Sequence, residues 1–190
     1  MNKHLLSFVI LILGAMIFSS SRSVESFSTI SSGADSVKKS EKPNADIGAK
    51  LIDFTVVTNE DILMFKDQLV KKNKPFVLIL FNPACGHCTD AIEHFVAAKE
   101  KFEGIPIVFI TGSNLYGEIK KCALDTKSAE MKSMVIAADN SEVTKQLFEY
   151  KGIPQLMIYD KHQILQSKYY IDIPVNSVDS TLKALQKKSN

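Results

Sequence analysis

Short apolar runs alternate with helix-like stretches from about residue 51 onward. Residues 75–81, 105–111 and 134–138 are continuous apolar runs rich in branched side chains, which is typical of strands covered on both faces. Residues 51–57 form a fourth candidate strand. Apolar positions recur at helical spacing between the runs, over residues 86–102 and in shorter stretches at 114–124 and 142–150.

Capping patterns mark the starts of two further helices. Thr58 and Asp61, three residues apart, predict a helix whose inward side carries Ile62, Phe65 and Leu69. Asn176 and Asp179 predict the cap of a last helix, which turns inward the side chains of Val178, Leu182 and Leu185.

The last third of the chain departs from the alternation of strand and helix. Two apolar segments, 155–160 and 164–171, are joined by three polar residues, a link short enough to predict an antiparallel hairpin. Together with the earlier strands and helices, this hairpin predicts an α/β fold with a mixed central sheet sandwiched between helices.

The first residues have the features of a secretory signal. A lysine near the start precedes an apolar run of 14 residues, Leu5 to Phe18, and small residues follow. We expect residues 1–21 to be a signal peptide, with an uncleaved N-terminal anchor as the alternative, since a bilayer span takes about 20 apolar residues. The serine-rich residues 22–46 predict a flexible linker, and residues 47–188 the folded domain. The domain is then expected in the periplasm or on the extracellular side of the membrane, where thiols meet oxidants.

Charge and cysteine content narrow the chemistry. The 190 residues carry 23 basic and 21 acidic side chains without a basic stripe interleaved with aromatic residues, so no nucleic-acid partner is expected. Only three cysteines occur, Cys85, Cys88 and Cys122, which are too few for a scaffold stapled by disulfides. Packing must therefore stabilise the fold, which leaves the close pair free for chemistry.

The close pair lies in the segment FNPACGHCTD, where a buried strand gives way to a helix. The unpaired amides and positive dipole end of that helix favour the thiolate of Cys85, whereas Cys88 is one turn further in and on the apolar side. This asymmetry predicts that Cys85 attacks a substrate disulfide and that Cys88 resolves the mixed disulfide, leaving a Cys85–Cys88 disulfide. His87 is expected to favour the thiolate as a cation, and Gly86 to leave the sulfur open to a partner.

Other uses of the pair fit the sequence less well. A structural zinc site takes four ligands, and the chain has no second cysteine pair. Haem attachment needs histidine directly after the second cysteine, where this chain has Thr89. A purely structural disulfide across so short a loop would stabilise little. No metal site and no cofactor are expected, and a redox-inert or metal-binding (zinc or copper) module is the alternative. Cys122, alone on a helical stretch, is expected to be a small buried hydrophobe.

The residues around the pair resemble the thioredoxin superfamily. CGHC is similar to the active-site tetrapeptide of protein disulfide isomerase domains, and it follows a buried strand as it does there. Ile153 and Pro154, in KGIPQLMIYD, are similar to the residues of the superfamily that form a cis-proline bond facing the dithiol. The resemblance covers residues 47–187 and implies a thioredoxin-like fold in which Gly86, Ile153 and Pro154 contact an extended peptide.

The secretory start and the extra helix and strand between residues 111 and 138 look most like the extracytoplasmic branch of bacterial thiol-disulfide proteins, including reductases of cytochrome maturation. That branch implies cysteine-containing protein substrates and a membrane or periplasmic electron partner. The direction of electron flow stays open, because His87 favours an oxidising couple whereas the branch favours reduction. The chain also departs from the family in having Ala84 where thioredoxins usually carry tryptophan, and Ile79 where they bury an acid.

Overall fold

The computed structural model describes residues 42–44, 46–70 and 73–188. The expected signal peptide at residues 1–21 and most of the expected linker at residues 22–46 lie outside the described residues. Within the described part, no helix combines the length and the apolar character that a membrane crossing requires.

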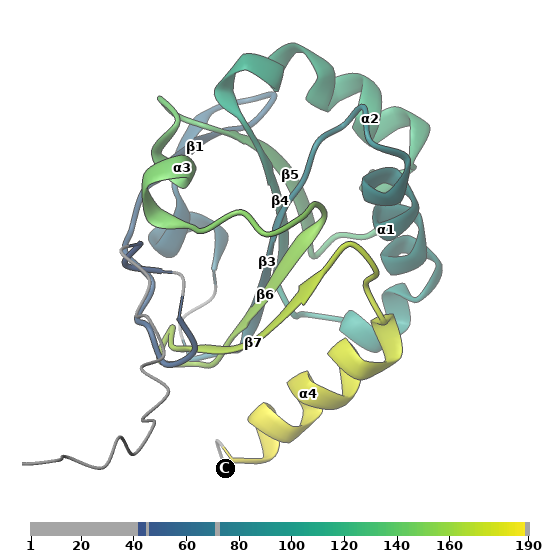
Figure 1. Cartoon of the computed structure of the whole chain (residues 1–190). Helices are drawn as coiled ribbons and strands as arrows, with labels where there is room; N and C mark the ends of the chain where they lie inside the picture. The colour runs from purple at the N-terminus through teal and green to yellow at the C-terminus, as the bar shows by residue number, and fades with distance from the viewer. Residues whose placement is uncertain (1–41, 45, 71–72, 189–190) are drawn as a thin grey trace, which may run out of the picture. The chain divides into compact units, whose positions relative to one another are not determined.

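A mixed sheet of seven strands forms the centre of the described domain, in the order β2-β1-β5-β4-β3-β6-β7 (Figure 1). Strands β3, β4 and β5 run parallel, and the hairpin of β6 and β7 joins antiparallel to β3. On the other side, β1 pairs antiparallel with both β5 and β2. The strands are β1 Thr55–Val57, β2 Ile62–Met64, β3 Phe76–Leu80, β4 Ile107–Thr111, β5 Met134–Asp139, β6 Gln155–Tyr159 and β7 Leu165–Tyr170.

Helices cover both faces of this sheet (Figure 1). The longer ones, α1 Gly86–Ala97, α2 Ile119–Asp125 and α4 Val175–Lys187, lie over one face and enclose the larger core cluster. The short helix α3 Val143–Leu147 covers the other face together with the segment that precedes β1. The described residues also form short helical segments: a π-helical turn at Phe65–Leu69 and 3-10 helices at Lys99–Phe102, Ser113–Glu118 and Ser128–Glu130. The expected α/β class, with a mixed sheet between helices, is confirmed, and α2 and β5 are the predicted extra helix and strand.

The predicted helix after Thr58 is wrong. The Thr58 hydroxyl oxygen accepts hydrogen bonds from the backbone N–H groups of Glu60 and Asp61, at 3.2 and 3.1 Å, as a helix cap would. The chain then turns back as β2, which pairs with β1, so the side chain of Ile62 points to solvent and is 59% exposed. Helical geometry begins only at Phe65, which is buried. Side-chain hydrogen bonds of this kind form both in turns and at helix starts, so the spacing of Thr58 and Asp61 does not distinguish a turn from a helix start.

The predicted capping residues of the last helix are also wrong. Helix α4 begins directly after Pro174, whose fixed φ suits a helix start. Asn176 lies inside the first turn and accepts a hydrogen bond from the ammonium of Lys101, at 2.6 Å. Asp179 pairs with Lys183 at 2.8 Å. The inward side of the helix is as expected, because Val178 and Leu182 are fully buried.

Candidate functional site

Cys85 lies at the start of α1, after the loop that follows β3. It is the N-cap residue of this 12-residue helix, with extended backbone angles of φ −98° and ψ 121°. Its carbonyl oxygen accepts hydrogen bonds from the backbone N–H groups of Cys88 and Thr89, at 2.9 and 3.1 Å. The side chain is half-buried. Its sulfur is thus placed at the positive end of the helix dipole and within reach of a partner.

Cys88 lies one turn further along α1 and is fully buried in the larger core cluster. The pKa of the Cys88 thiol is raised to about 12, and burial is the largest cause. The hydrogen bond and charge of neighbouring Cys85 contribute in the same direction, whereas the backbone N–H of Asn82, 3.4 Å from the sulfur, lowers the pKa. Cys88 therefore keeps its proton at neutral pH and is shielded from solvent.

Asn82 holds the loop between β3 and α1, a role that the sequence analysis missed. Its side-chain oxygen accepts the backbone N–H of Ala84 at 2.8 Å, and its carbonyl oxygen accepts that of Cys85 at 3.0 Å. With the bond to the Cys88 sulfur, one residue thus contacts the backbone or side chain of both cysteines. The available signal was its position directly before Pro83, because Asn-Pro commonly begins a turn.

Replacing Asn82 with alanine is expected to loosen this loop. The backbone bonds to the cysteines survive in Asn82→Ala, but the bond to Ala84 is lost, at a cost of about 0.5–1.5 kcal/mol of unfolding free energy. We also expect the rate of disulfide exchange to fall several-fold, since the loop that positions Cys85 becomes less ordered. Denaturant unfolding and exchange kinetics measure the two effects.

Asn140 supplies the matched control, because its side chain donates one hydrogen bond to Thr55, at 3.0 Å, between β5 and β1. Asn140→Ala should lower stability by a similar amount and leave the exchange rate unchanged. An Asn82→Ala protein that exchanges disulfides as fast as the wild type would show that Asn82 does not position the dithiol.

The loop that precedes β6 lies beside the dithiol. Strand β6 pairs with β3 in a register that sets Gln155 opposite Leu80, so the residues before β6 adjoin those after β3. The Ile153–Pro154 peptide bond in this loop is cis. Ile153 is half-buried and packs, like Cys85, against the larger core cluster. Cys85, Cys88, Ile153 and Pro154 therefore belong to one end of the sheet.

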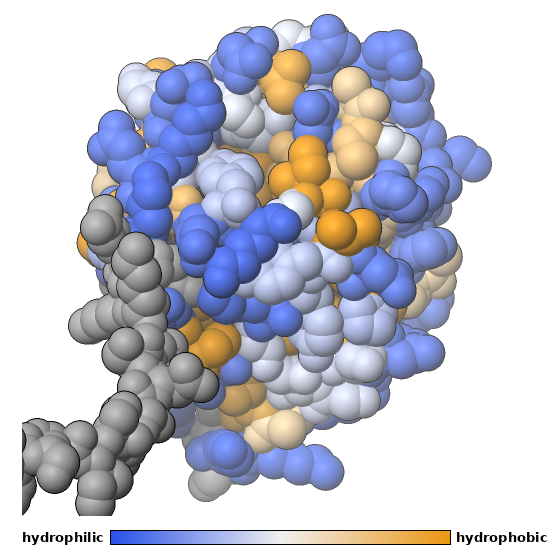
Figure 2. Space-filling model, in the orientation of Figure 1, coloured by the Kyte–Doolittle hydropathy of each residue, from blue (hydrophilic) through white to orange (hydrophobic). Residues whose placement is uncertain are grey.

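Two loops meet at this end of the sheet, one before β6 and one after β7. The Pro154 carbonyl oxygen accepts the backbone N–H of Ile171 at 2.8 Å. A Cβ on Gly152 would lie 2.9 Å from Ile171 Cγ1, so glycine permits the close approach. Ile171 is 52% exposed, and Figure 2 shows hydrophobic surface where these loops lie in Figure 1. A partner that reaches Cys85 thus meets an apolar surface beside it.

Gly86 and His87 are both on the exposed side of the start of α1. An added Cβ at Gly86 would meet no atom within 4 Å, so packing does not require glycine there and space beside Cys85 stays open. His87 lines a pocket of about 210 Å³ together with Asp90, His94 and residues 171–173. The expected effect of His87 on the thiolate stays a prediction.

Cys122 is buried on α2 in the same core cluster as Cys88. Burial raises the pKa of its thiol to about 11, so it carries little thiolate at neutral pH. This environment fits the expectation of a small buried hydrophobe. Among the residues that the structure describes, no three His, Cys, Asp or Glu side chains come together in a way that could hold a metal ion.

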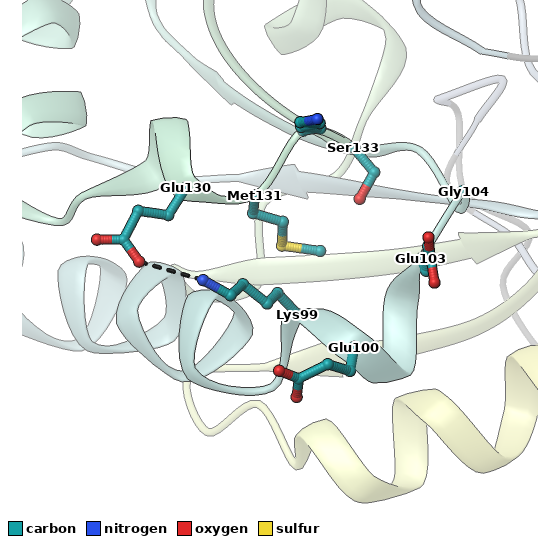
Figure 3. Close-up of a pocket in the computed structure, with 8 residues that line it drawn as sticks. Lys99, Glu100, Glu103, Gly104, Glu130, Met131 and Ser133 are labelled. Atoms are coloured by element: carbon teal, nitrogen blue, oxygen red, sulfur yellow. Dashed lines mark hydrogen bonds and ion pairs between the residues drawn. The ribbon is translucent and has the colours of Figure 1, made fainter.

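A second hollow, of about 350 Å³, lies at the far end of α1 from the dithiol (Figure 3). It is formed by the residues after α1 and those before β5, and an ion pair of 3.2 Å joins Lys99 and Glu130 across it. The 12 residues of α1 separate the two ends by about 18 Å at the usual rise per residue. This hollow is not part of the dithiol site.

Comparison with known proteins identifies the fold. No protein-family model and no curated protein matches the sequence. Among solved structures, the domain is similar to a thioredoxin domain of a thiol-disulfide oxidoreductase from Bacteroides vulgatus. The TM-score is 0.60 with 15% identity, over 72% of this chain and 98% of that one.

Two further solved structures are similar to the domain, and each is of a protein described as a candidate for the activity in its name. One is a protein disulfide isomerase from Bacteroides thetaiotaomicron, with a TM-score of 0.60 and 15% identity over 75% of this chain and 91% of that one. The other is a thioredoxin from Neisseria meningitidis, with a TM-score of 0.61 and 10% identity over 79% and 94%.

Proposed function

The chain has a thioredoxin-like fold, and we propose that it is a thiol-disulfide oxidoreductase that exchanges a Cys85–Cys88 disulfide or dithiol with the cysteines of protein substrates. The observation that carries the proposal is the asymmetry of the pair. Cys85 is half-buried at a helix start, and Cys88 is fully buried one turn away with its pKa raised to about 12. The Cys85 sulfur is therefore available to attack a substrate, whereas the Cys88 sulfur is shielded and can react only with Cys85.

Reduction of a substrate would take two steps. The Cys85 thiolate attacks one sulfur of the substrate disulfide, a bond forms between them, and the second substrate sulfur leaves as a thiolate that takes up a proton. The Cys88 thiol then loses its proton and attacks Cys85. The first substrate sulfur is released, and the Cys85–Cys88 disulfide remains. Two electrons have passed from the dithiol to the substrate, and the reverse sequence oxidises a dithiol substrate.

Several residues around the pair support substrate binding in this proposal. Gly86 leaves open space beside Cys85, and Ile153 and Pro154 adjoin the dithiol on the loop before β6. An extended peptide could pair with the backbone of that loop, as strands pair at a sheet edge. His87, exposed on α1, would favour the thiolate as a cation.

We place the activity outside the cytoplasm, on the strength of the export signal expected at residues 1–21. An oxidoreductase there needs a membrane or periplasmic thiol-disulfide partner to restore its dithiol or its disulfide. Titration of the Cys85–Cys88 couple against glutathione would indicate the direction of electron flow, since a potential near that of glutaredoxin or below favours reduction.

Turnover of insulin disulfides by the purified domain, with glutathione as the electron donor, tests the proposal. We expect catalysed reduction of insulin well above the rate with glutathione alone. No catalysis, together with stoichiometric zinc or copper in protein purified under reducing conditions, would favour the metal-binding alternative. No catalysis and no metal would favour a redox-inert module.

A further inference from the structure

The loop before β6, residues 148–154, is buried only at its ends. Phe148 at its start is 1% exposed and packs in the smaller core cluster, and Pro154 at its end is buried as well. The residues between them, 149–153, are exposed or half-buried. Core packing therefore does not hold the middle of this loop, and hydrogen bonds must place it.

Gln155, the first residue of β6, holds the middle of the loop with both ends of its side-chain amide. Its Oε1 accepts the backbone N–H of Lys151 at 3.0 Å, and its Nε2 donates to the carbonyl oxygen of Glu149 at 2.9 Å. The side chain lies on the α3 side of the sheet, because Met157, two residues further along β6, packs in the smaller core cluster. Gln155 is 2% exposed in an otherwise apolar strand, and the two hydrogen bonds offset the cost of burying its amide.

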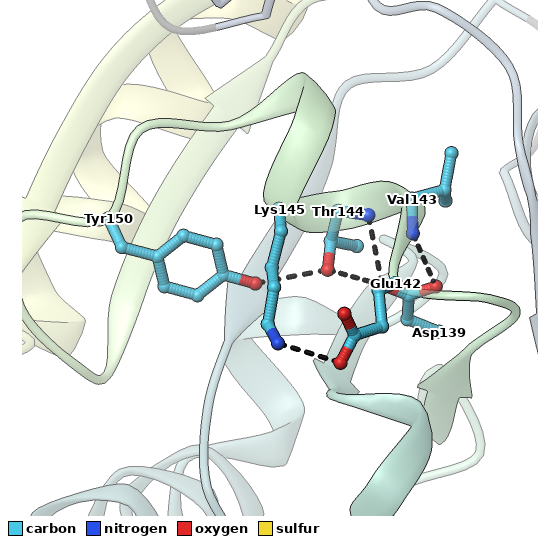
Figure 4. Close-up of polar contacts among 6 residues, drawn as sticks. All are labelled: Asp139, Glu142, Val143, Thr144, Lys145 and Tyr150. Atoms are coloured by element: carbon cyan, nitrogen blue, oxygen red, sulfur yellow. Dashed lines mark hydrogen bonds and ion pairs between the residues drawn. The ribbon is translucent and has the colours of Figure 1, made fainter.

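Tyr150 connects the middle of the same loop to a buried carboxylate (Figure 4). Its hydroxyl donates to Thr144 Oγ1 on α3 at 3.0 Å, and the Thr144 hydroxyl donates to Asp139 Oδ2 at 2.6 Å. Asp139, at the end of β5, is 1% exposed and also accepts the backbone N–H groups of Val143 and Thr144, each at 2.9 Å. The loop is thus tied to a strand of the central sheet through two side chains.

The backbone between β5 and α3 is strained. Ser141 and Glu142 have left-handed φ values of 67° and 59°, which cost energy in residues other than glycine. The hydrogen bonds that Asp139 accepts fix the start of α3 and offset this cost. Strain that the surrounding contacts maintain is typical of functional sites, where placement matters. Here the strained turn places Thr144, to which the Tyr150 hydroxyl is bonded.

We infer that Gln155 and Tyr150 are positioning residues for disulfide exchange, which hold the middle of the loop before β6 and so keep Ile153–Pro154 beside the dithiol. Both residues act through the loop. The inference rests on the proposed function and names the residues that order its peptide-binding loop. A loop that is already ordered loses less entropy when a peptide pairs with it, so the substrate binds more tightly.

Gln155→Met tests the inference, because methionine has a similar length but lacks the amide that makes both hydrogen bonds to the loop. We expect KM for a short peptide with one disulfide to rise about 3- to 10-fold, with little change in kcat. Hydroxyethyl disulfide has no peptide backbone to pair with the loop. The ratio of kcat/KM for the peptide to kcat/KM for hydroxyethyl disulfide should therefore fall by a similar factor. Tyr150→Phe keeps the ring, loses the bond to Thr144, and should lower this ratio about 2- to 5-fold.

Asp160→Ala is the matched control at the other end of β6. The Asp160 side chain accepts the backbone N–H groups of His162 and Ile164, at 2.8 and 3.0 Å, and so holds the turn between β6 and β7. Its loss should lower the stability of the fold and keep the wild-type ratio of the two kcat/KM values. An unchanged ratio in Gln155→Met or in Tyr150→Phe, or an equal fall in Asp160→Ala, would overturn the inference.

Amide hydrogen exchange reads the order of the loop without any disulfide chemistry. The Lys151 N–H, which is bonded to Gln155 Oε1, should exchange at least about 10-fold faster in Gln155→Met than in the wild type, and at the wild-type rate in Asp160→Ala. Faster exchange of this amide in a protein that turns over no disulfide would retain Gln155 as an anchor of the loop and reject the oxidoreductase. Faster exchange with an unchanged kinetic ratio would reject the positioning role and retain the oxidoreductase.

Discussion

Cys85→Ser is expected to reduce insulin turnover by a factor on the order of 10³ or more, to the rate of glutathione alone. A hydroxyl at this position is hardly ionised and cannot form a disulfide, so the first step of the exchange is lost. The fold should be retained, because Cys85 is half-buried and its side chain makes no cap hydrogen bond in α1. Coupled glutathione oxidation measures the rate, and circular dichroism checks the fold.

Cys122→Ala is the control for Cys85→Ser, since it also removes one thiol. Cys122 is buried on α2, and its thiol has a pKa of about 11, so we expect nearly wild-type turnover and some loss of stability. Turnover in Cys85→Ser that matches the wild type would mean that the chain exchanges disulfides through another group, or not at all.

Cys88→Ser is expected to stop the reaction after its first step. The mixed disulfide at Cys85 then has no internal thiol to resolve it, and only a thiol from solution can release the substrate. An internal thiol acts at an effective concentration of about 1 mM or more, so with micromolar external thiol we expect release to slow by on the order of 10³. Intact mass measurement under non-reducing conditions should show one substrate per protein. Release as fast as in the wild type would exclude Cys88 as the resolving thiol.

The resolution of the mixed disulfide by Cys88 should depend steeply on pH in the wild type. Cys88 must lose its proton before it attacks, and its pKa is about 12. Below the pKa, the thiolate fraction of Cys88 rises about tenfold for each pH unit. The rate of substrate release should therefore increase by up to about tenfold per pH unit between about pH 6 and 9. In the mixed disulfide Cys85 carries no charge, but burial, the largest cause of the raised pKa, remains. Single-turnover decay of the mixed disulfide gives the rate, and a flat profile would mean that proton loss from Cys88 is not limiting.

The core of the fold could be predicted because its strands are buried on both sides. Strands β3 and β4 are fully buried, and such strands read as unbroken apolar runs. The hairpin of β6 and β7 was predicted from a link too short for a crossover. Local capping patterns failed at Thr58 and Asn176. The hydrogen bonds of a cap also form in turns, and a proline can begin a helix without a side-chain cap.

The dithiol could be predicted from spacing alone, whereas the residues that hold it could not. Cys85 and Cys88 were found because a helix turn sets the second cysteine behind the first. Asn82 acts largely through backbone groups, which every residue type possesses, so its identity carries only the weak signal of the Asn-Pro turn. The loop before β6 comes to lie beside the loop after β3 only through the pairing of these two distant strands, and no local pattern encodes such a meeting.

The central claim is that one thiol of the pair is reactive while the other is withheld by burial. Brief alkylation of the fully reduced protein with iodoacetamide at pH 7.5, followed by peptide mapping, tests it most directly. We predict that Cys85 is labelled, and that Cys88 is labelled only after the protein is unfolded. Labelling of Cys88 in the folded protein at the rate of Cys85 would contradict the account.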